Sequence, residues 1–91
     1  MTIRCTGRHM AGGDGHTHIE SLRWVADGKS ETQTSASEIL IKWIKNNNGQ
    51  AYVVDGNGDR LWVAVVEADP PYLQTQKDGA WTDNLLGLPI Y

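Results

Sequence analysis

Three histidines near the start of the chain are the side chains best suited to hold a metal ion. His16 and His18 are two positions apart, and residues with this spacing project from the same face of a strand. His9 ends an earlier extended segment and would face that pair across a hairpin. With Asp14 as an optional carboxylate, the three imidazoles predict a Zn²⁺ or Ni²⁺ site. The simpler interpretation, which we favour, is three exposed histidines beside a glycine-rich loop.

A second candidate metal site is the segment 55–59 (DGNGD), which repeats the first three ligand positions of an EF-hand calcium loop. Arg60 then occupies the position that requires glycine, and Val66 occupies the position that requires glutamate. We therefore interpret this segment as a hairpin turn, because Asp, Asn and Gly are the residues that tight turns favour.

Nothing in the chain has the spacing of a known catalytic centre. There is no Gly-x-Ser-x-Gly elbow, no phosphate-binding glycine loop and no cysteine with a motif-spaced histidine. Cys5 is the only cysteine and lies in an alternating apolar segment, so we predict a buried thiol and no intrachain disulfide. We expect a protein that is not an enzyme, and no residue pattern requires a cofactor.

Aromatic residues are the other side chains with functional potential. The chain has four tryptophans and three tyrosines but no phenylalanine. Our first interpretation is that these bulky rings fill a small core. The alternative is that Trp24, Trp62 and Trp81, together with Arg23, form a binding surface, because Trp, Tyr and Arg dominate the energetics of protein interfaces.

The elements that position these residues are predicted from hydrophobic periodicity and turn residues. Five segments are predicted to be strands: 2–8, 16–26, 51–55, 60–68 and 72–75. The tail after residue 83 ends in a leucine-rich run that is too short for an independent helix, and we expect it to pack across the sheet.

One helix is predicted over 36–47. Ser35 and Glu38 have capping-box spacing, and the apolar residues that follow recur at helical intervals. Asn48, followed by glycine, supplies a left-handed cap. The element order is therefore ββαβββ, a single α+β domain over 1–91 in which one helix packs on a twisted antiparallel sheet.

A short signature marks the C-terminal third. The segment 72–79 (YLQTQKDG) is followed by 83–89 (DNLLGLP). Together they resemble the closing motif of the bacterial and phage family called domain of unknown function 3892, which reads Y-L-x-T-x-x-D-G and then D/N-N-L-L-x-L-P. The resemblance implies a shared fold and a phage or bacterial setting. Because that family has no established activity, the resemblance implies no catalytic or binding chemistry for this chain.

The charge distribution restricts the classes of partner. The formal net charge is −3, and residues 50–91 hold six acidic residues against two basic ones. An acidic surface repels phosphate chains, so we expect no direct nucleic-acid partner. No segment resembles a membrane span or a signal peptide, and a lone thiol is typical of reducing compartments, so we expect a cytoplasmic protein without a membrane partner.

These observations predict a binding module for an unknown protein partner or for self-association as a homodimer. The alternative is a protein that binds or sequesters a small ligand such as a nucleotide. That alternative requires Arg4, Arg8 or Arg23 to lie beside a Trp-lined cleft, where an indole could stack on the base and a guanidinium could hold the phosphate.

Overall fold

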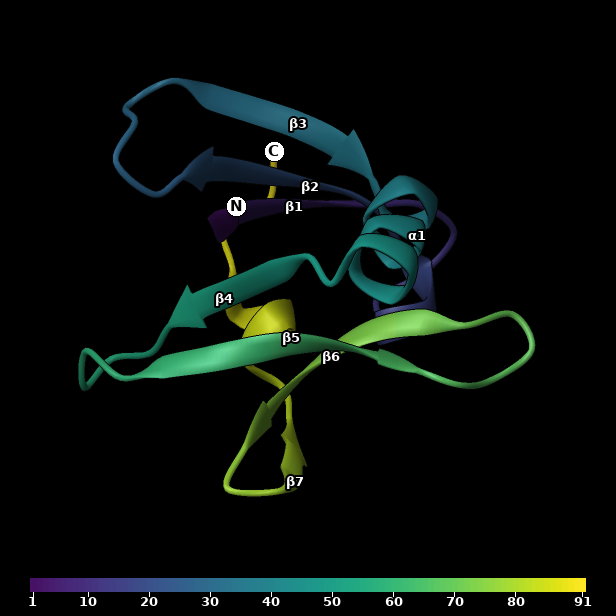
Figure 1. Cartoon of the computed structure of the whole chain (residues 1–91). Helices are drawn as coiled ribbons and strands as arrows, with labels where there is room; N and C mark the ends of the chain where they lie inside the picture. Colours follow the sequence, from purple (N-terminus) through teal and green to yellow (C-terminus); the bar gives the residue numbers. More distant parts are fainter.

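Seven strands form one sheet in the computed structural model, which describes residues 1–91 (Figure 1). They are β1 (Thr2–Met10), β2 (Ile19–Ala26), β3 (Thr32–Ala36), β4 (Gln50–Val54), β5 (Arg60–Val66), β6 (Tyr72–Lys77) and β7 (Ala80–Thr82). Their order across the sheet is β3-β2-β1-β4-β5-β6-β7. All neighbours are antiparallel except β1 and β4, which are parallel. A parallel pair requires a crossover connection, and the segment that contains the only α-helix supplies it.

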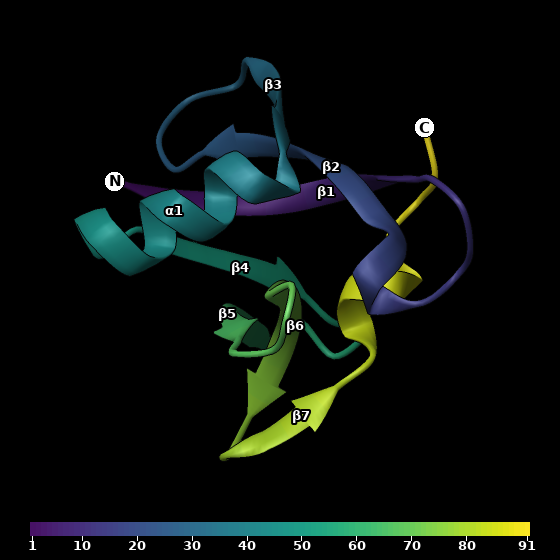
Figure 2. The same cartoon turned by 90° about the vertical axis from the view of Figure 1, so that its right-hand side faces the viewer.

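The helix α1 (Ser37–Asn47) confirms the predicted amphipathic helix. Its buried residues, Leu40 and Ile41, face the sheet. It contacts β2 and β3 as well as β5 and β6, so the sheet curls around it (Figure 2). Asn48 ends the helix in the left-handed conformation, with φ of 52°, as the sequence predicted.

The predicted capping box at the start of this helix is wrong. Ser35 belongs to β3, and its hydroxyl accepts a hydrogen bond from Trp24 Nε1 at 3.0 Å. The helix begins after Ala36 without a side-chain cap. Ser37 instead donates its hydroxyl hydrogen to the Ile19 carbonyl at 2.7 Å, which ties the first turn of α1 to β2.

The α+β class is confirmed, but the predicted ββαβββ order omits two strands. The strand β3 has the sequence TQTSA and buries no residue, so it lacks the apolar alternation by which strands are predicted. The strand β7 has only three residues after the turn at 78–79. It is held to β6 by a hydroxyl–hydroxyl hydrogen bond of 2.6 Å between Thr82 and the fully buried Thr75.

The core lies between the inner face of the curled sheet and α1. Its buried members come from every long strand: Ile3, Cys5, Ile19, Leu22, Ala26, Leu40, Ile41, Ala51, Val53, Leu61, Val63, Leu73 and Leu85. Leu85 belongs to the short 3-10 helix η2 (Asn84–Gly87) and is fully buried. The tail then forms a parallel bridge between Ile90 and Arg8 of β1. The leucine-rich tail therefore packs against the sheet, as predicted.

The helices are all short relative to a bilayer. The longest, α1, has 11 residues, and none combines the length and the apolar composition needed to cross a membrane.

Candidate binding surface

The sheet register places four side chains in one row on the outer face of the sheet. Tyr52 pairs with Trp62, Trp62 pairs with Gln76, and Gln76 pairs with Trp81. Residues that pair directly across strands project from the same face. Their neighbours along the strands, such as Val63, point to the opposite face and are buried in the core. We call Tyr52, Trp62, Gln76 and Trp81 the aromatic row.

The two indoles of the aromatic row are exposed, although its tyrosine is not. Trp62 is 42% exposed and Trp81 is 45% exposed, whereas Tyr52 is 5% exposed. The Tyr52 ring meets the Trp62 ring edge to face, with 5.7 Å between centroids. Its hydroxyl donates a hydrogen bond of 2.7 Å to Asp27. This hydrogen bond and burial raise the pKa of Tyr52 above its usual value.

Arginines border the Tyr52 end of the aromatic row. The Arg60 guanidinium lies 4.4 Å from the centroid of the Tyr52 ring, a cation–π contact. Arg4 of β1 is paired with Tyr52 on the other side. Because Tyr52 is held by Asp27 and covered by Arg60, this end of the row is fixed in position by the fold itself.

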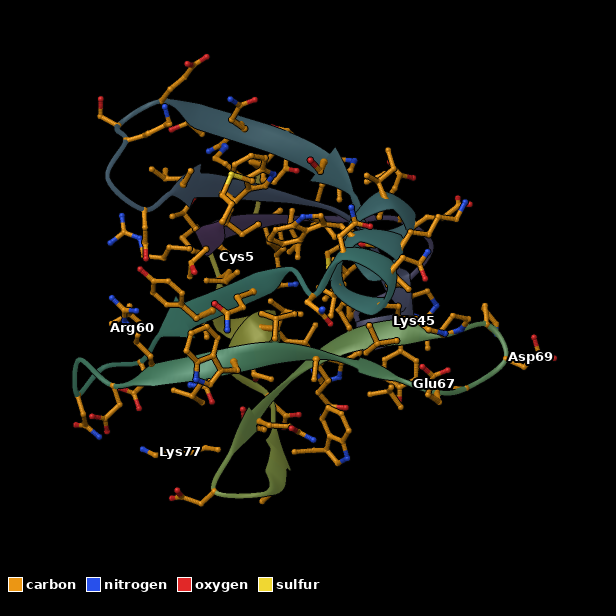
Figure 3. The ribbon with its side chains drawn as sticks, viewed as in Figure 1. Cys5, Lys45, Arg60, Glu67, Asp69 and Lys77 are labelled. Atoms are coloured by element: carbon orange, nitrogen blue, oxygen red, sulfur yellow. The ribbon has the colours of Figure 1, made fainter.

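The turn between β4 and β5 is tied to the end of β6, close to the row. Lys77 forms ion pairs with Asp55 at 3.5 Å and with Asp59 at 3.1 Å. Figure 3 shows Lys77 toward the same end of the sheet as Arg60. Asp55 accepts hydrogen bonds from the amides of Asn57 and Asp59, and these amides with Lys77 lower its pKa. The segment 55–59 is thus the predicted hairpin turn, and the Asp55 carboxylate accepts its hydrogen bonds from amides of the same turn.

Two of the four tryptophans pack against the core and two are exposed on the surface. The core-filling interpretation therefore applies only to the first two. Trp24 pairs with the buried Cys5, on the inner face, and packs against the core, as does Trp43 of α1. Trp62 and Trp81 lie on the outer face. The predicted surface of Trp24, Trp62, Trp81 and Arg23 is therefore not one continuous site. The sequence does not give the strand pairing that separates the two groups.

Arg23 and Arg8 hold the C-terminal tail. The Arg23 guanidinium lies 4.3 Å from the Tyr91 ring centroid, and Arg8 Nε donates a hydrogen bond of 3.0 Å to the Leu88 carbonyl. Tyr91 shares a hydrogen bond of 2.7 Å with Ser21. None of the three surface hollows is lined by an arginine. The nucleotide-binding alternative therefore lacks its required juxtaposition of arginine and a Trp-lined cleft.

The three histidines do not assemble into a metal site. His9 Nδ1 donates to the Tyr91 carbonyl at 2.8 Å, His18 Nδ1 accepts from the Gly15 amide at 3.3 Å, and His16 stacks on Tyr72. No three His, Cys, Asp or Glu side chains are grouped to hold an ion. The prediction assumed an extended 16–18 segment, but these residues form the 3-10 turn η1 (His16–His18) and β2 begins only at residue 19.

His16 is nevertheless an unusual histidine. Its side chain is 13% exposed, its Nε2 atom is buried without a hydrogen-bond partner, and Asp83 Oδ1 lies 3.9 Å away. Burial lowers the pKa of His16, and the nearby Asp83 opposes this shift. The neutral form is therefore favoured in the folded protein.

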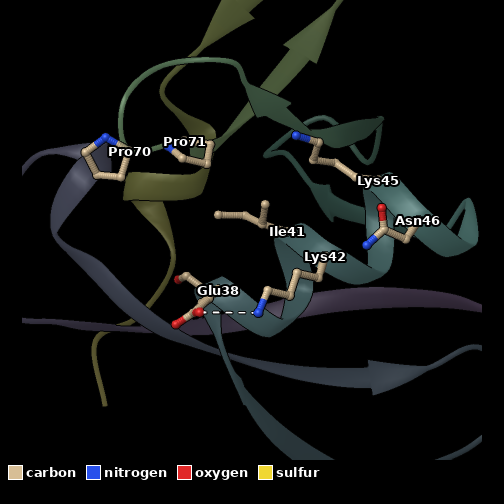
Figure 4. A pocket seen from close by; sticks show the side chains of 8 residues that line it. Glu38, Ile41, Lys42, Lys45, Asn46, Pro70 and Pro71 are labelled. Atoms are coloured by element: carbon tan, nitrogen blue, oxygen red, sulfur yellow. Dashed lines mark ion pairs between the residues drawn. The ribbon is translucent and has the colours of Figure 1, made fainter.

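The largest hollow lies between α1 and the proline pair 70–71 (Figure 4). It has a volume of about 530 Å³ and a floor at Ile41. Glu38 and Lys42 at its rim pair with each other at 3.4 Å. A smaller, mainly apolar groove of about 170 Å³ lies between the first three strands and α1, lined by Met1, Ile3, Trp24, Ser35, Ile39, Leu40 and Trp43.

The only thiol is buried, as predicted. Cys5 is 2% exposed, and burial raises its pKa to about 12. Because the thiolate is the reactive form of cysteine, this residue serves as a small core side chain.

The comparisons with known proteins agree with the C-terminal signature. A family described as protein of unknown function (DUF3892) matches residues 2–89. No curated protein and no solved structure matches the chain. The match covers nearly the whole sequence, so the chain belongs to the family of domain of unknown function 3892.

Proposed function

We propose that this protein is a non-enzymatic protein-interaction module that binds its partner through the aromatic row. The observation that carries the proposal is the placement of Trp62 and Trp81, 42% and 45% exposed, in register on either side of Gln76. Exposed indoles next to a stacked Tyr–Arg pair form the combination that supplies most of the binding energy in protein interfaces.

The fixed end of the row supports this proposal. Tyr52 is anchored by its hydrogen bond to Asp27, and Arg60 stacks on it. Side chains that are already ordered lose little rotamer entropy when a partner binds, and each rotamer-rich side chain that is immobilised otherwise costs about 1 kcal/mol. The row therefore needs to order mainly its two indoles.

The spacing of the row favours an extended, proline-rich segment of the partner. Neighbouring strands lie about 4.8 Å apart, so the backbones of Trp62 and Trp81 are separated by about 10 Å. A polyproline II helix repeats after three residues, or about 9.3 Å, and offers a proline ring at each repeat. Aromatic side chains commonly bind such segments by stacking on the proline rings.

The charges near the row favour a neutral or basic segment over a phosphate chain. The turns that flank the strands of the row carry Asp55, Asp59 and Asp78, and Lys77 pairs with the first two. Arg4 and Arg60 lie only at the Tyr52 end of the row. Single-stranded nucleic acid also stacks on aromatic rings, but its backbone requires a basic groove. The free thiol, Cys5, supports a reducing compartment such as the cytoplasm as the place of action.

The proposal is tested by titrating the purified chain with three probes and following tryptophan fluorescence. The probes are a proline-rich decapeptide, a glycine–serine decapeptide and a thymidine decanucleotide. We expect binding of the first probe only, and a loss of about tenfold or more in affinity for Trp62→Ala and for Trp81→Ala. Ile39→Ala is the matched control, because Ile39 is 61% exposed but lies on α1.

A second measurement separates the partner class from the proposed function. Proteins captured by the wild-type chain from its host are identified, purified and measured against the Trp62→Ala/Trp81→Ala double variant. A purified partner that the double variant no longer binds supports the interaction module even if the proline-rich peptide fails. Binding of every partner by both proteins with equal affinity would falsify the assignment of the aromatic row.

A further inference from the structure

The loop between β5 and β6 carries two of the chain's three prolines. Pro70 and Pro71 are exposed, as are residues 67–69 before them, and we call residues 67–71 the proline loop. Figure 4 shows both proline rings at the edge of the large hollow beside α1. A proline ring is the group that we propose the aromatic row binds, so the chain carries a segment of that chemistry in its own sequence.

The proline loop and the aromatic row lie at opposite ends of the β5–β6 hairpin. Trp62 precedes Val66, the last residue of β5, by four positions, which corresponds to about 13 Å along a strand. Figure 3 shows Asp69, in the loop, and Arg60, at the start of β5, on opposite sides of the molecule. Because the paired strands hold the loop at this distance, a chain cannot place the loop on its own row. The two surfaces can meet only between copies.

We propose that the proline loop of one copy binds the aromatic row of the next, so that copies of the chain associate head to tail. This contact rests on the proposed function of the row, and its partner is a second copy of the chain. The two surfaces differ, so the interface is heterologous, and every open assembly keeps a free row at one end and a free loop at the other. A copy placed end to end with the first presents its loop at the Arg60 side of the row.

The gap between the two indoles is large enough for a proline ring. Trp62 and Trp81 flank Gln76 in the register, so their backbones are about 10 Å apart. A ring held between two indoles needs a van der Waals contact of about 3.5–4.0 Å on each face, or about 7–8 Å in total. A proline of the loop therefore fits between the indoles, above Gln76.

Charge sets the orientation of the loop on the row. Asp69 directly precedes the prolines and is exposed, and Arg60 is exposed at the near end of the row. Asp69 therefore faces a guanidinium when the loop enters from that end. The other acid of the loop, Glu67, is already paired with Lys45 of its own copy at 3.1 Å. The reverse orientation would bring Asp69 toward Asp78, in the turn before β7, and is disfavoured by like charge.

The contact is small, so the association is weak. A loop of five residues buries less than the roughly 1,000 Å² that a stable interface needs. We expect a dissociation constant on the order of 0.1–1 mM. Because the interface is heterologous, we expect oligomers that grow with concentration and do not stop at a dimer.

The test measures the mean mass of the full chain by light scattering over concentrations of about 0.05–3 mM, which bracket this dissociation constant. We expect the mean mass of the wild type to rise with concentration. The loop variant, Pro70→Ala/Pro71→Ala, and the row variant, Trp62→Ala/Trp81→Ala, should each weaken the association about tenfold or more. Pro89→Ala is the matched control and should associate as the wild type does, because Pro89 is the remaining proline and is exposed outside the loop.

A mixture of the loop variant and the row variant identifies the heterologous contact. The row variant retains an intact loop and the loop variant retains an intact row, so one contact can form between them. We expect 1:1 heterodimers that grow no further, because both free ends of the heterodimer carry the substitutions. Heterodimer formation also shows that both variants are folded. A wild type that stays monomeric at about 3 mM, or a loop variant that associates as the wild type does, would overturn the proposal.

The proline-rich decapeptide separates head-to-tail association from the proposed function. A peptide that binds the row should also disperse the wild-type oligomers, because both ligands occupy the same indoles. Peptide binding without self-association, or oligomers that persist when the row is saturated with peptide, would rule out the head-to-tail contact and leave the function of the row standing. Self-association that the loop and row substitutions both abolish, and that their mixture restores as heterodimers, supports the contact even if the peptide fails to bind.

Discussion

The outer face of the sheet has two regions that share one motif but differ in what covers it. On β2, Arg23 stacks on Tyr91, and on β5, Arg60 stacks on Tyr52. In the first region the tyrosine comes from the chain's own tail, which lies over the sheet. In the second region the tyrosine belongs to the sheet, and Trp62 beside it is left exposed.

The difference distinguishes the aromatic residues that the chain itself covers from those that it leaves exposed. The tail covers the first region closely, because a Cβ atom at Gly7 would lie 3.1 Å from the Tyr91 ring. That distance is shorter than a normal van der Waals contact, so a side chain at position 7 would require the Tyr91 ring to shift by a few tenths of an ångström. The indoles of the aromatic row remain 42% and 45% exposed, and this exposure is the basis of our proposal that they contact a partner.

The largest expected effect tests the tail as part of the fold. Leu85 is fully buried, so Leu85→Ala removes apolar contacts and leaves a cavity. We expect it to lower the free energy of unfolding by about 3 kcal/mol, measured by urea denaturation. A loss comparable to that of an exposed residue would show that the tail is not part of the core.

A smaller effect is expected where the tail meets the sheet. Tyr91→Ala removes the hydrogen bond to Ser21 and the stacking contact with Arg23. We expect a loss of about 1–2 kcal/mol in unfolding free energy. Tyr91→Phe is the matched control, because it keeps the ring and removes only the hydroxyl. We expect Tyr91→Phe to lower the unfolding free energy by about half as much as Tyr91→Ala does. Equal effects of the two variants would assign the whole contribution to the hydrogen bond.

The aromatic row should contribute less to stability than the tail does. Trp62→Ala and Trp81→Ala remove side chains that are nearly half exposed. We expect each to lower the unfolding free energy by less than about 1 kcal/mol, in contrast to their large effect on binding. If either variant has a urea midpoint as low as that of Leu85→Ala, its indole contributes to the core. The two regions would then not differ as we describe.

The smallest effect concerns pH and His16 in the 3-10 turn η1. Burial lowers the pKa of His16 below its ordinary value of 6.5. The folded state then binds protons less readily than the unfolded state, so stability is full above pH 6.5 and falls as the pH drops below it. Comparing urea midpoints across this window with those of His16→Phe isolates the contribution. If the urea midpoints of the wild type and of His16→Phe depend on pH in the same way, His16 is not the source of the pH dependence.

The sequence predicts those elements whose residues alternate or recur with a clear period. The helix, its Asn48 cap, the turn at 55–59 and the family signature in the tail are all predicted, because each depends on local chemistry. The strand β3 is not, because an edge strand of Thr, Gln and Ser has no apolar pattern. It is held by backbone pairing with β2 and by the hydrogen bond from Trp24 to Ser35, and neither interaction leaves an apolar pattern in the sequence.

The candidate surface is predicted only in part for a related reason. A tryptophan in a strand faces either the core or the solvent, and its sequence neighbours do not decide which of these holds when both faces carry apolar residues. Trp24 lies on the face of the sheet that carries the buried Cys5 and packs against the core, whereas Trp62 lies on the face opposite its buried neighbours Leu61 and Val63. The strand pairings behind this difference connect distant parts of the chain. The aromatic row exists only once β4, β5, β6 and β7 are side by side.

The single parallel contact between β1 and β4 makes the sheet a union of two antiparallel meanders. It rests on three residue pairs, from Thr2 with Gln50 to Arg4 with Tyr52. The first meander precedes α1 in the chain and the second follows it, so the seam between them joins segments that are distant in the sequence. A tag or label fused to the first residues would therefore disturb the pairing of β1 with β4, which joins the two halves of the sheet. A tag at the C-terminal side is the safer choice only if Tyr91 keeps its contacts with β1 and β2.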